Sequence, residues 1–483
     1  MEKIYRTDEK IRSSTKWFFA LGDVFQGGYF NLVNFFYSIF LTDVVGISPI
    51  WAANVFLFGK IWDAVTDPAM GIISDNTRSR FGRRRPYFLF GAPLVFAAFV
   101  MMWHPLSSGS DAAKIAFYIF AYMLMNTAST IVSVPFLAMS AELSTDYNER
   151  TSITNIRMVV SLASSIICAV APMLIVAMYT DVRSGYLTMS LVFGLFFALP
   201  LLLVFFKVPE RKQFSEGRKG SVKEMFAALQ LRVFRRYIAM YLGIVVAMDI
   251  ISMIFAYYMT YNLERPSELS FVLGALLIAE VAMVPLASFF AKKTSKTRAV
   301  TLGNIGWLCC AVCSMLITKD SPGFSIYLLA IVLGCFISFS LVGFTALFGD
   351  ATEVGEYHFG RRIEGSFSGI QQFIRKCAAA LANWIALTLL GISGFVSPAE
   401  DVVDGVTTLV TQSQSETVLF AIKGIMGFSS IILLVPATII AVRWTLTKEK
   451  HAALISYLDR KRSGVEAGPE EEEAIRESLK PLI

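Results

Sequence analysis

Twelve long apolar stretches follow one another along this chain of 483 residues, separated by polar links. A helix needs about 20 mostly apolar residues to cross the hydrocarbon core of a bilayer, and only helices and closed barrels satisfy their backbone hydrogen bonds there. The stretches lie near residues 17–42, 49–73, 87–105, 113–140, 158–179, 186–206, 237–262, 270–291, 299–317, 324–349, 364–393 and 416–442. The sequence therefore predicts an all-α membrane protein with twelve transmembrane helices.

Composition supports this class and excludes others. Hydrophobic residues make up 55% of the chain, charged residues 17%, and the mean hydropathy is +0.59, values typical of membrane proteins. The net charge of +6 comes from short basic clusters between apolar stretches, so we expect no nucleic-acid binding. Residues 1–16 are polar and lack the apolar core of a signal peptide, which predicts an N-terminal tail.

Lysine and arginine are concentrated on alternate links, for example in residues 78–85 and 292–298. Links such as 107–111 and 397–404 contain no lysine or arginine. Because basic links stay on the cytoplasmic side, this asymmetry predicts a multi-pass protein of the cell (inner) membrane with both termini in the cytoplasm.

The two halves of the chain echo one another. NTRSRFGRRRP joins the second and third stretches, and KKTSKTR joins the corresponding pair in the second half. We expect an N-terminal six-helix bundle, a cytoplasmic linker, a C-terminal six-helix bundle and a cytoplasmic tail, at residues 1–206, 207–236, 237–443 and 444–483. This is the plan of the major facilitator fold. The tail segment EEEEAIRESLK is typical of a solvated amphipathic helix or a disordered segment.

The second apolar stretch contains three charged residues, Lys60, Asp63 and Asp67. Their spacing of three and four places them on one helical face, and a charge at mid-bilayer costs roughly 2.5 to 3.5 kcal/mol. Two carboxylates this close repel each other unless a cation or a proton lies between them. The pattern predicts a site for Na⁺, Li⁺ or H⁺, with a structural ion-pair network as the alternative.

Several other polar residues fall at membrane depth. For Asp249 and Glu280 the structural and functional interpretations are balanced, and neither receives a role. The polar residues at membrane depth outside the second stretch are Asp23, Gln26, Arg157, Asp249, Glu280, Gln371, Gln372, Arg375 and Lys376.

Five motifs together carry a resemblance to a known family. They are LTDVVGIS, WDAVTDP, GIISDNTRSRFGRRRP, TIVSVPFLAM and GDATEVGEYHFGRRIEGSFSGIQQFIRK. On these motifs the chain resembles the glycoside-pentoside-hexuronide:cation symporters of the major facilitator superfamily, along nearly its whole length. The resemblance implies a secondary active transporter that couples a cation to the symport of a sugar or glycoside (a pentoside, hexoside or glucuronide) by alternating access.

The resemblance also implies roles for single residues. The coupling cation, Na⁺ or H⁺, is bound by Asp63 and Asp67 with Thr130, and the two aspartates are metal ligands if the ion is Na⁺. Thr66 stands where the family has an amide-bearing residue, which weakens the case for Na⁺. The substrate-binding candidates are Gln26, Arg157, Gln371, Gln372 and Lys376.

Two positions depart from the pattern of the family's galactoside carriers. Where those carriers have acids on the first and fourth helices, this chain has Gly27 and Ser133. Losing both carboxylates removes the acceptors for galactoside hydroxyls, so we do not expect melibiose as a substrate.

Other functional classes fit the sequence less well. The chain has three histidines and no HExxH or GxSxG motif, and we expect neither an enzyme nor a cofactor. A channel would favour rings of residues from a symmetric oligomer, whereas this chain is expected to be a monomer with an acid pair in one half. The alternative within transporters is a cation-coupled symporter of lysolipids or other amphiphiles.

Overall fold

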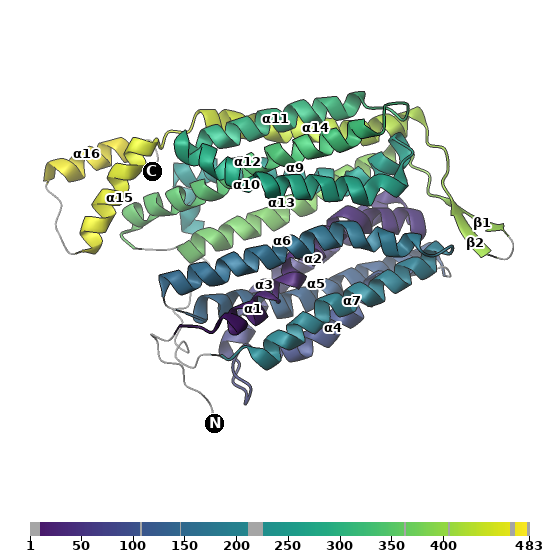
Figure 1. Cartoon of the computed structure of the whole chain (residues 1–483), viewed down its shortest axis with the longest axis horizontal. Coiled ribbons are helices and arrows are strands. Elements are labelled where there is room, and N and C mark those ends of the chain that lie inside the picture. The colour runs from purple at the N-terminus through teal and green to yellow at the C-terminus, as the bar shows by residue number, and fades with distance from the viewer. Residues whose placement is uncertain are drawn as a thin grey trace. The chain divides into compact units, whose positions relative to one another are not determined.

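The computed structural model describes residues 10–106, 109–144, 146–210, 226–361, 364–403, 406–463 and 469–480. Nearly all of this is helical (Figure 1). Within the described residues, nine helices are long and apolar enough to cross a membrane. They are α5 (Asp111–Glu142), α6 (Tyr147–Ala177), α7 (Val182–Lys207), α9 (Arg232–Tyr257, continued by the π-helical η5, Tyr258–Asn262), α10 (Leu269–Lys293), α11 (Lys296–Leu316), α12 (Phe324–Phe359), α13 (Glu364–Ile392) and α14 (Glu416–Val442).

The three other predicted spans are also helical, each with an irregularity. The polar residues of α3 lower its mean hydropathy, α4 is short, and the first span is divided into four helical pieces. The elements are α1 (Ser13–Ala20), α2 (Asp23–Leu32), the π-helical η1 (Val33–Tyr37) and η2 (Phe40–Val44), α3 (Pro49–Asn76) and α4 (Pro86–Met102). The predicted all-α membrane class is confirmed, and a count of twelve spans is consistent with these elements.

Local signals set several helix starts. Ser110 and Asp181 accept hydrogen bonds from backbone N–H groups of the first turns of α5 and α7, and Asp146 does the same for α6. Such caps satisfy N–H groups that have no partner inside the helix. Short polar links therefore end one span and begin the next.

A β-hairpin between α13 and α14 was not predicted. Strand β1 (Ala399–Val403) pairs antiparallel with β2 (Val406–Val410), with Ala399 opposite Val410 (Figure 1). The segment is rich in valine and threonine, which favour strands. The apolar-stretch pattern missed it because the strands are short and lie outside the spans.

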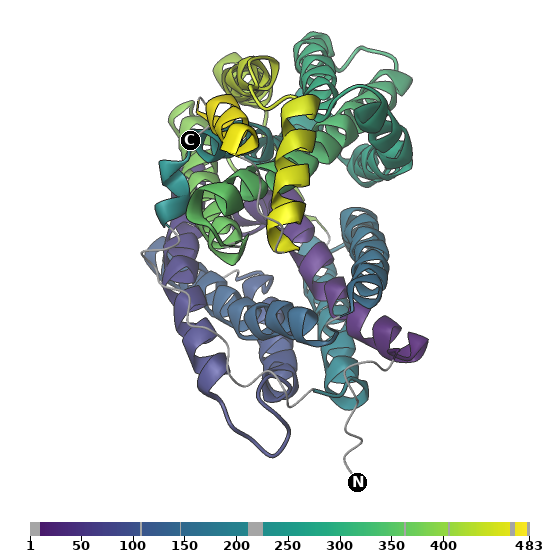
Figure 2. The same ribbon diagram turned by 90° about the vertical axis from the view of Figure 1, so that its left-hand side faces the viewer.

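The tail forms two further helices, α15 (Lys448–Arg462) and α16 (Pro469–Leu479), drawn in yellow in Figure 2. The helical alternative for EEEEAIRESLK is the one observed. One face of α16 is buried, since Ile475 and Leu479 are 5% and 0% exposed. Helix α15 also buries one face and is described below.

The chain divides into two compact units, each described here by itself. Unit 1 comprises Met1–Gly217, Ser252–Gly274 and Ala380–Ile422, and unit 2 comprises Arg218–Ile251, Ala275–Ala379 and Lys423–Ile483. Unit 1 thus contains the first six spans together with one end each of α9, α10, α13 and α14.

Hydrogen bonds hold these ends together inside unit 1. The Tyr261 hydroxyl donates to Asp43 Oδ2 over 2.7 Å, and Thr42 lies 2.9 Å from the Tyr257 hydroxyl. Trp384 Nε1 donates to Asn54 Oδ1 over 3.1 Å. These contacts link the first and second spans to α9 and α13 at the end that carries the hairpin.

Candidate functional site: a carboxylate pair in the second span

Asp63 and Asp67 of α3 meet at one hydroxyl group of α5. Thr130 Oγ1 lies 3.1 Å from Asp63 Oδ1 and 2.8 Å from Asp67 Oδ1. Asp63 and Thr130 are 6% and 3% exposed. A threonine hydroxyl carries a single proton, so it cannot fully compensate two carboxylate oxygens. Two carboxylates held this close to one another favour a proton or a small cation at this point.

A close approach of two helices places Thr130 at the acid pair. A Cβ atom added to Gly59 would lie 2.1 Å from the Tyr122 ring of α5. Gly59 is therefore required for this packing, and Asp63 follows it by one turn. Pro68, inside α3, has no N–H, so the carbonyl of Ala64 lacks the usual helical donor beside the pair.

Thr66 and Lys60 lie beside the pair on the same helix. Thr66 Oγ1 lies 3.3 Å from the backbone carbonyl of Asp63, so its hydroxyl is bonded within its own helix. The Lys60 ammonium lies 5.6 Å from the centroid of the Phe30 ring. The Thr66 hydroxyl thus bonds to the backbone of its own helix, and Lys60 makes a cation–π contact with α2.

Arg157 of α6 is held by Asp23 of α2. Its Nε and Nη2 atoms donate to the two Asp23 oxygens over 2.6 and 3.0 Å, and its Nη1 donates to Ser140 over 2.7 Å. The guanidinium also lies over the Phe136 ring, 4.8 Å from its centroid. Asp23 is 5% exposed. Sequence reasoning named both residues without pairing them, because they lie 134 positions apart.

The two positions that depart from the galactoside carriers lie in packed surroundings. Gln26 donates to Ser133 over 2.7 Å. A Cβ atom at Gly27 would lie 2.2 Å from Ser161 Oγ, so α2 and α6 touch there. An acidic side chain at position 27 has no room in this packing.

The candidates on α13 face two directions in unit 2. Gln371 is 9% exposed and donates to the Tyr237 hydroxyl over 3.1 Å, whereas Gln372 is exposed. Lys376 follows Gln372 by four residues and shares its helical face. Arg375, four residues after Gln371, lies 3.7 Å from Asp249. Asp249 thus has an ion-pair partner within unit 2, whereas Gln372 and Lys376 lie on a neighbouring face of α13.

Charged side chains also gather where the second and third spans are joined. Arg84 pairs with Glu142 of α5 over 2.8 Å and with Asp75 over 3.0 Å. Glu210, three residues after α7, accepts hydrogen bonds from the backbone N–H groups of Arg83 and Arg84. This network ties α3, α5 and the end of α7 together at a basic link, in agreement with a structural or conformational role.

Residues 18–448 match the family of MFS/sugar transport proteins. The chain belongs to this family. The isoprimeverose transporter of Lactiplantibacillus pentosus is 24% identical, with 80% of this chain and 81% of that protein covered. The mouse sodium-dependent lysophosphatidylcholine symporter 1 is 26% identical, over 56% of this chain and 57% of that protein. A D-xylose-proton symporter structure has the same fold, with a TM-score of 0.62, 14% identity, and 89% and 96% of the two chains covered.

The match confirms the resemblance drawn from the motifs. The protein is a multi-pass transporter of the major facilitator type with a small-molecule substrate, and it is not an enzyme. Bacterial symporters among its relatives place it in the cell membrane.

Proposed function

We propose that this protein is a cation-coupled symporter of a sugar or glycoside that works by alternating access. The observation that carries the proposal is the meeting of Asp63, Asp67 and Thr130 at one point inside unit 1. Asp63 is buried and Asp67 is half-buried, and two like-charged carboxylates held together within a span are suited to bind the coupling ion.

The coupling ion is Na⁺ or H⁺. The carboxylates of Asp63 and Asp67 with the Thr130 hydroxyl offer oxygen atoms, which hard cations such as Na⁺ prefer and which also bind a proton. The Thr66 hydroxyl donates to the Asp63 carbonyl, and the lone pairs of its oxygen stay available to a cation. The ion is therefore proposed to be held by the pair and Thr130, with Thr66 in a supporting position.

Residues of both sequence halves are proposed to bind the substrate. On the strength of the motifs these are Gln26 and Arg157 in unit 1, and Gln371, Gln372 and Lys376 in unit 2. Arg157 is oriented by Asp23, and a guanidinium fixed in this way is suited to hydroxyl or carboxylate oxygens. The similarity to an isoprimeverose transporter supports a glycoside, and we propose that the protein acts as a monomer.

The alternative substrate is a lysolipid or another amphiphile, supported by the similarity to a lysophosphatidylcholine symporter. The two candidates differ in where substrate polarity lies: a glycoside presents hydroxyls over its whole surface, whereas a lysolipid has a polar head and a long apolar chain. The polar candidates Gln371 and Gln372 favour the glycoside.

A thermal-shift screen of the purified protein tests the substrate class. We expect one of the pentosides, hexosides or glucuronides to raise the melting temperature, and to raise it further with Na⁺ or at lower pH, because a ligand of the folded state stabilises it by mass action. Melibiose should produce no shift. Stabilisation by lysophosphatidylcholine alone would replace the glycoside proposal with the amphiphile alternative.

A labelling experiment tests the proposed orientation, in which both termini are cytoplasmic. In a background without reactive native cysteines, Ser413→Cys, beside the hairpin, should react with an impermeant maleimide in intact cells, because it is exposed and one predicted span separates it from the tail in the sequence. The matched variant Ser463→Cys, at the exposed end of α15, should react only after permeabilisation. The reverse pattern would invert the topology. Ser108, on another weakly basic link, lies outside the described residues.

A further inference from the structure

Helix α15 lies against the end of α12, and both belong to unit 2 (Figures 1 and 2). Leu454, Tyr457 and Leu458 are 1%, 5% and 2% exposed, and their spacing of three and four defines one apolar face. The Tyr457 ring packs on Tyr357 of α12 with 5.6 Å between centroids. The tail helix is therefore docked through an apolar face of its own.

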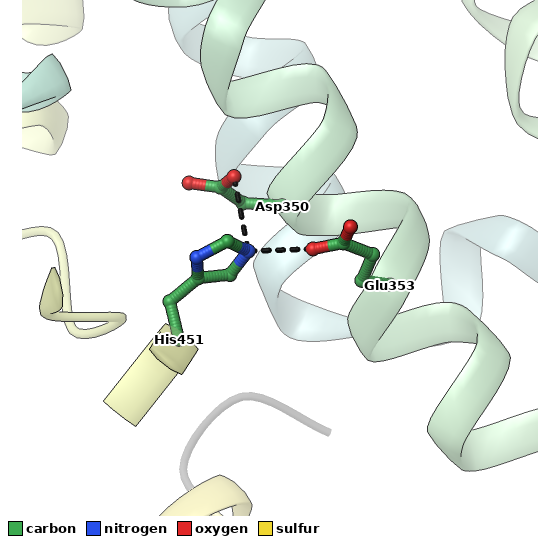
Figure 3. Close-up of side chains that lie close together, drawn as sticks. All are labelled: Asp350, Glu353 and His451. Carbon is green, nitrogen blue, oxygen red and sulfur yellow. Dashed lines mark hydrogen bonds and ion pairs between the residues drawn. The ribbon is translucent and has the colours of Figure 1, made fainter. Parts of the chain in front are cut away.

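Two basic side chains flank this apolar face and reach a stripe of acids on α12. His451 Nε2 lies 2.5 Å from Glu353 Oε2 and 3.2 Å from Asp350 Oδ1 (Figure 3). At the other end of α15, Arg462 forms two hydrogen bonds with Glu356, over 2.6 and 3.0 Å. The acids are three residues apart, so they face α15 together.

Lys296 of α11 completes the charge balance around His451. Its Nζ lies 2.5 Å from Asp350 Oδ1. Asp350 and Glu353 together carry two negative charges, Lys296 supplies one positive charge, and a proton on His451 supplies the second. Because Lys296 and His451 already bond to these carboxylate oxygens, we assign this cluster to ion pairing and not to a metal.

Protonation of His451 therefore strengthens docking. The hydrogen bond to Glu353 and the charges of Asp350 and Glu353 raise the pKa of His451 above its ordinary value, against the opposing effects of burial and of Lys296. A raised pKa means that the docked state binds the proton more tightly than the undocked state does. The contribution to docking is complete below the ordinary pKa of histidine and is lost as pH rises through the raised pKa.

At the corresponding position in unit 1, the contacts among the described residues are made by arginine and glutamate. There Glu210, after the sixth span, bonds to the arginine link, and Arg84 pairs with Glu142 at the end of the fourth span. Arginine does not lose its proton at physiological pH. In each half, the end of the fourth helix is thus connected to a segment that follows the sixth helix. Among the contacts named here, only that of His451 titrates near neutrality.

We propose that α15 is a pH-sensitive latch on the end of α12, fastened when His451 is protonated and released as the pH around the tail becomes alkaline. On the orientation proposed above, the sensed pH is that of the cytoplasm. A fastened tail restrains α12, so release is expected to increase the rate of transport; this consequence rests on the proposed function.

Hydrogen–deuterium exchange of the full-length protein in lipid nanodiscs tests the latch without any substrate. After correction for intrinsic rates, backbone amides of α15 should exchange roughly tenfold or more faster at about pH 9 than at about pH 6, because a charge-assisted hydrogen bond is lost. Amides of α11 serve as the internal reference. Equal protection of α15 at both pH values would overturn the proposal.

Two substitutions at the same position provide the matched variants. His451→Gln can donate a hydrogen bond but cannot carry charge, so its α15 should exchange fast at both pH values. His451→Lys keeps its charge across this range and should stay protected at both. A pH response retained in His451→Gln, or removed by a chelator in the unaltered protein, would contradict the assignment to the His451 proton. Since this readout needs no transport, it can fail or succeed independently of the proposed symport.

Discussion

Asp63→Asn and Asp67→Asn are each expected to abolish uphill accumulation of substrate in membrane vesicles. The remaining carboxylate shares Thr130 with a neutral amide, so the site loses one of the two negative charges that attract the coupling cation. Substrate should still equilibrate across the membrane, because alternating access without a coupled ion becomes facilitated diffusion. Uptake driven by an imposed Na⁺ or H⁺ gradient, compared with uptake without one, measures the effect.

Stability distinguishes coupling from the ion-pair alternative. Removing one of two like charges relieves repulsion, so the melting temperature of either variant should stay the same or rise. If the pair were a structural network with Lys60, neutralising either aspartate would lower the melting temperature.

Thr130→Val should weaken the cation dependence of uptake less than the aspartate variants do, by about 1 kcal/mol for one hydrogen bond. Asp111→Asn, an exposed carboxylate at the start of α5, is the control that should leave coupling intact. Full accumulation in both aspartate variants would refute the cation site.

Asp23→Asn should destabilise the protein strongly, by about 3 to 5 kcal/mol, because the Arg157 side chain is only 16% exposed and loses the charge of its carboxylate partner. Ser140 and the neutral amide oxygen at position 23 would remain as polar partners, but neither carries a compensating charge. The melting temperature in detergent reports the loss. Arg78→Gln, which removes an exposed arginine, should change stability by less than about 0.5 kcal/mol.

A double-mutant cycle then separates structure from recognition. Asp23→Asn combined with Arg157→Gln removes both charges, so most of the lost stability should return. Transport should not return, because the proposed substrate contact of Arg157 is gone. Additive losses of stability would show that the two residues are not coupled, and recovered transport in the double variant would remove Arg157 from the substrate site.

Much of the fold followed from the sequence because the bilayer limits the alternatives. A backbone in hydrocarbon must satisfy its own hydrogen bonds, so each long apolar stretch predicts a helix whatever its neighbours are. The helical repeat also located the candidate site. Asp63 and Asp67 are one turn apart, and helical geometry alone places them side by side. Thr130 came from the family motif, and its contact with both carboxylates followed from the packing allowed by Gly59.

Other features lay beyond any local pattern. The hairpin at Ala399–Val410 is too short to register as a span, and its strands are specified by each other. The partner of Arg157 lies 134 residues away, and that of His451 lies 98 residues away on another helix. Nothing in the spacing of Asp23 or His451 distinguishes a buried ion pair from a solvated charge.

The sequence by itself determined the membrane class, the succession of spans and the acid pair, because the bilayer and the helical repeat act on residues close together in the chain. Only the tertiary structure decided which charges meet across helices: Asp23 with Arg157, Arg84 with Glu142, and His451 with Asp350 and Glu353. The physical reason is that a buried charge needs a partner, but helix packing selects which of many distant residues it is.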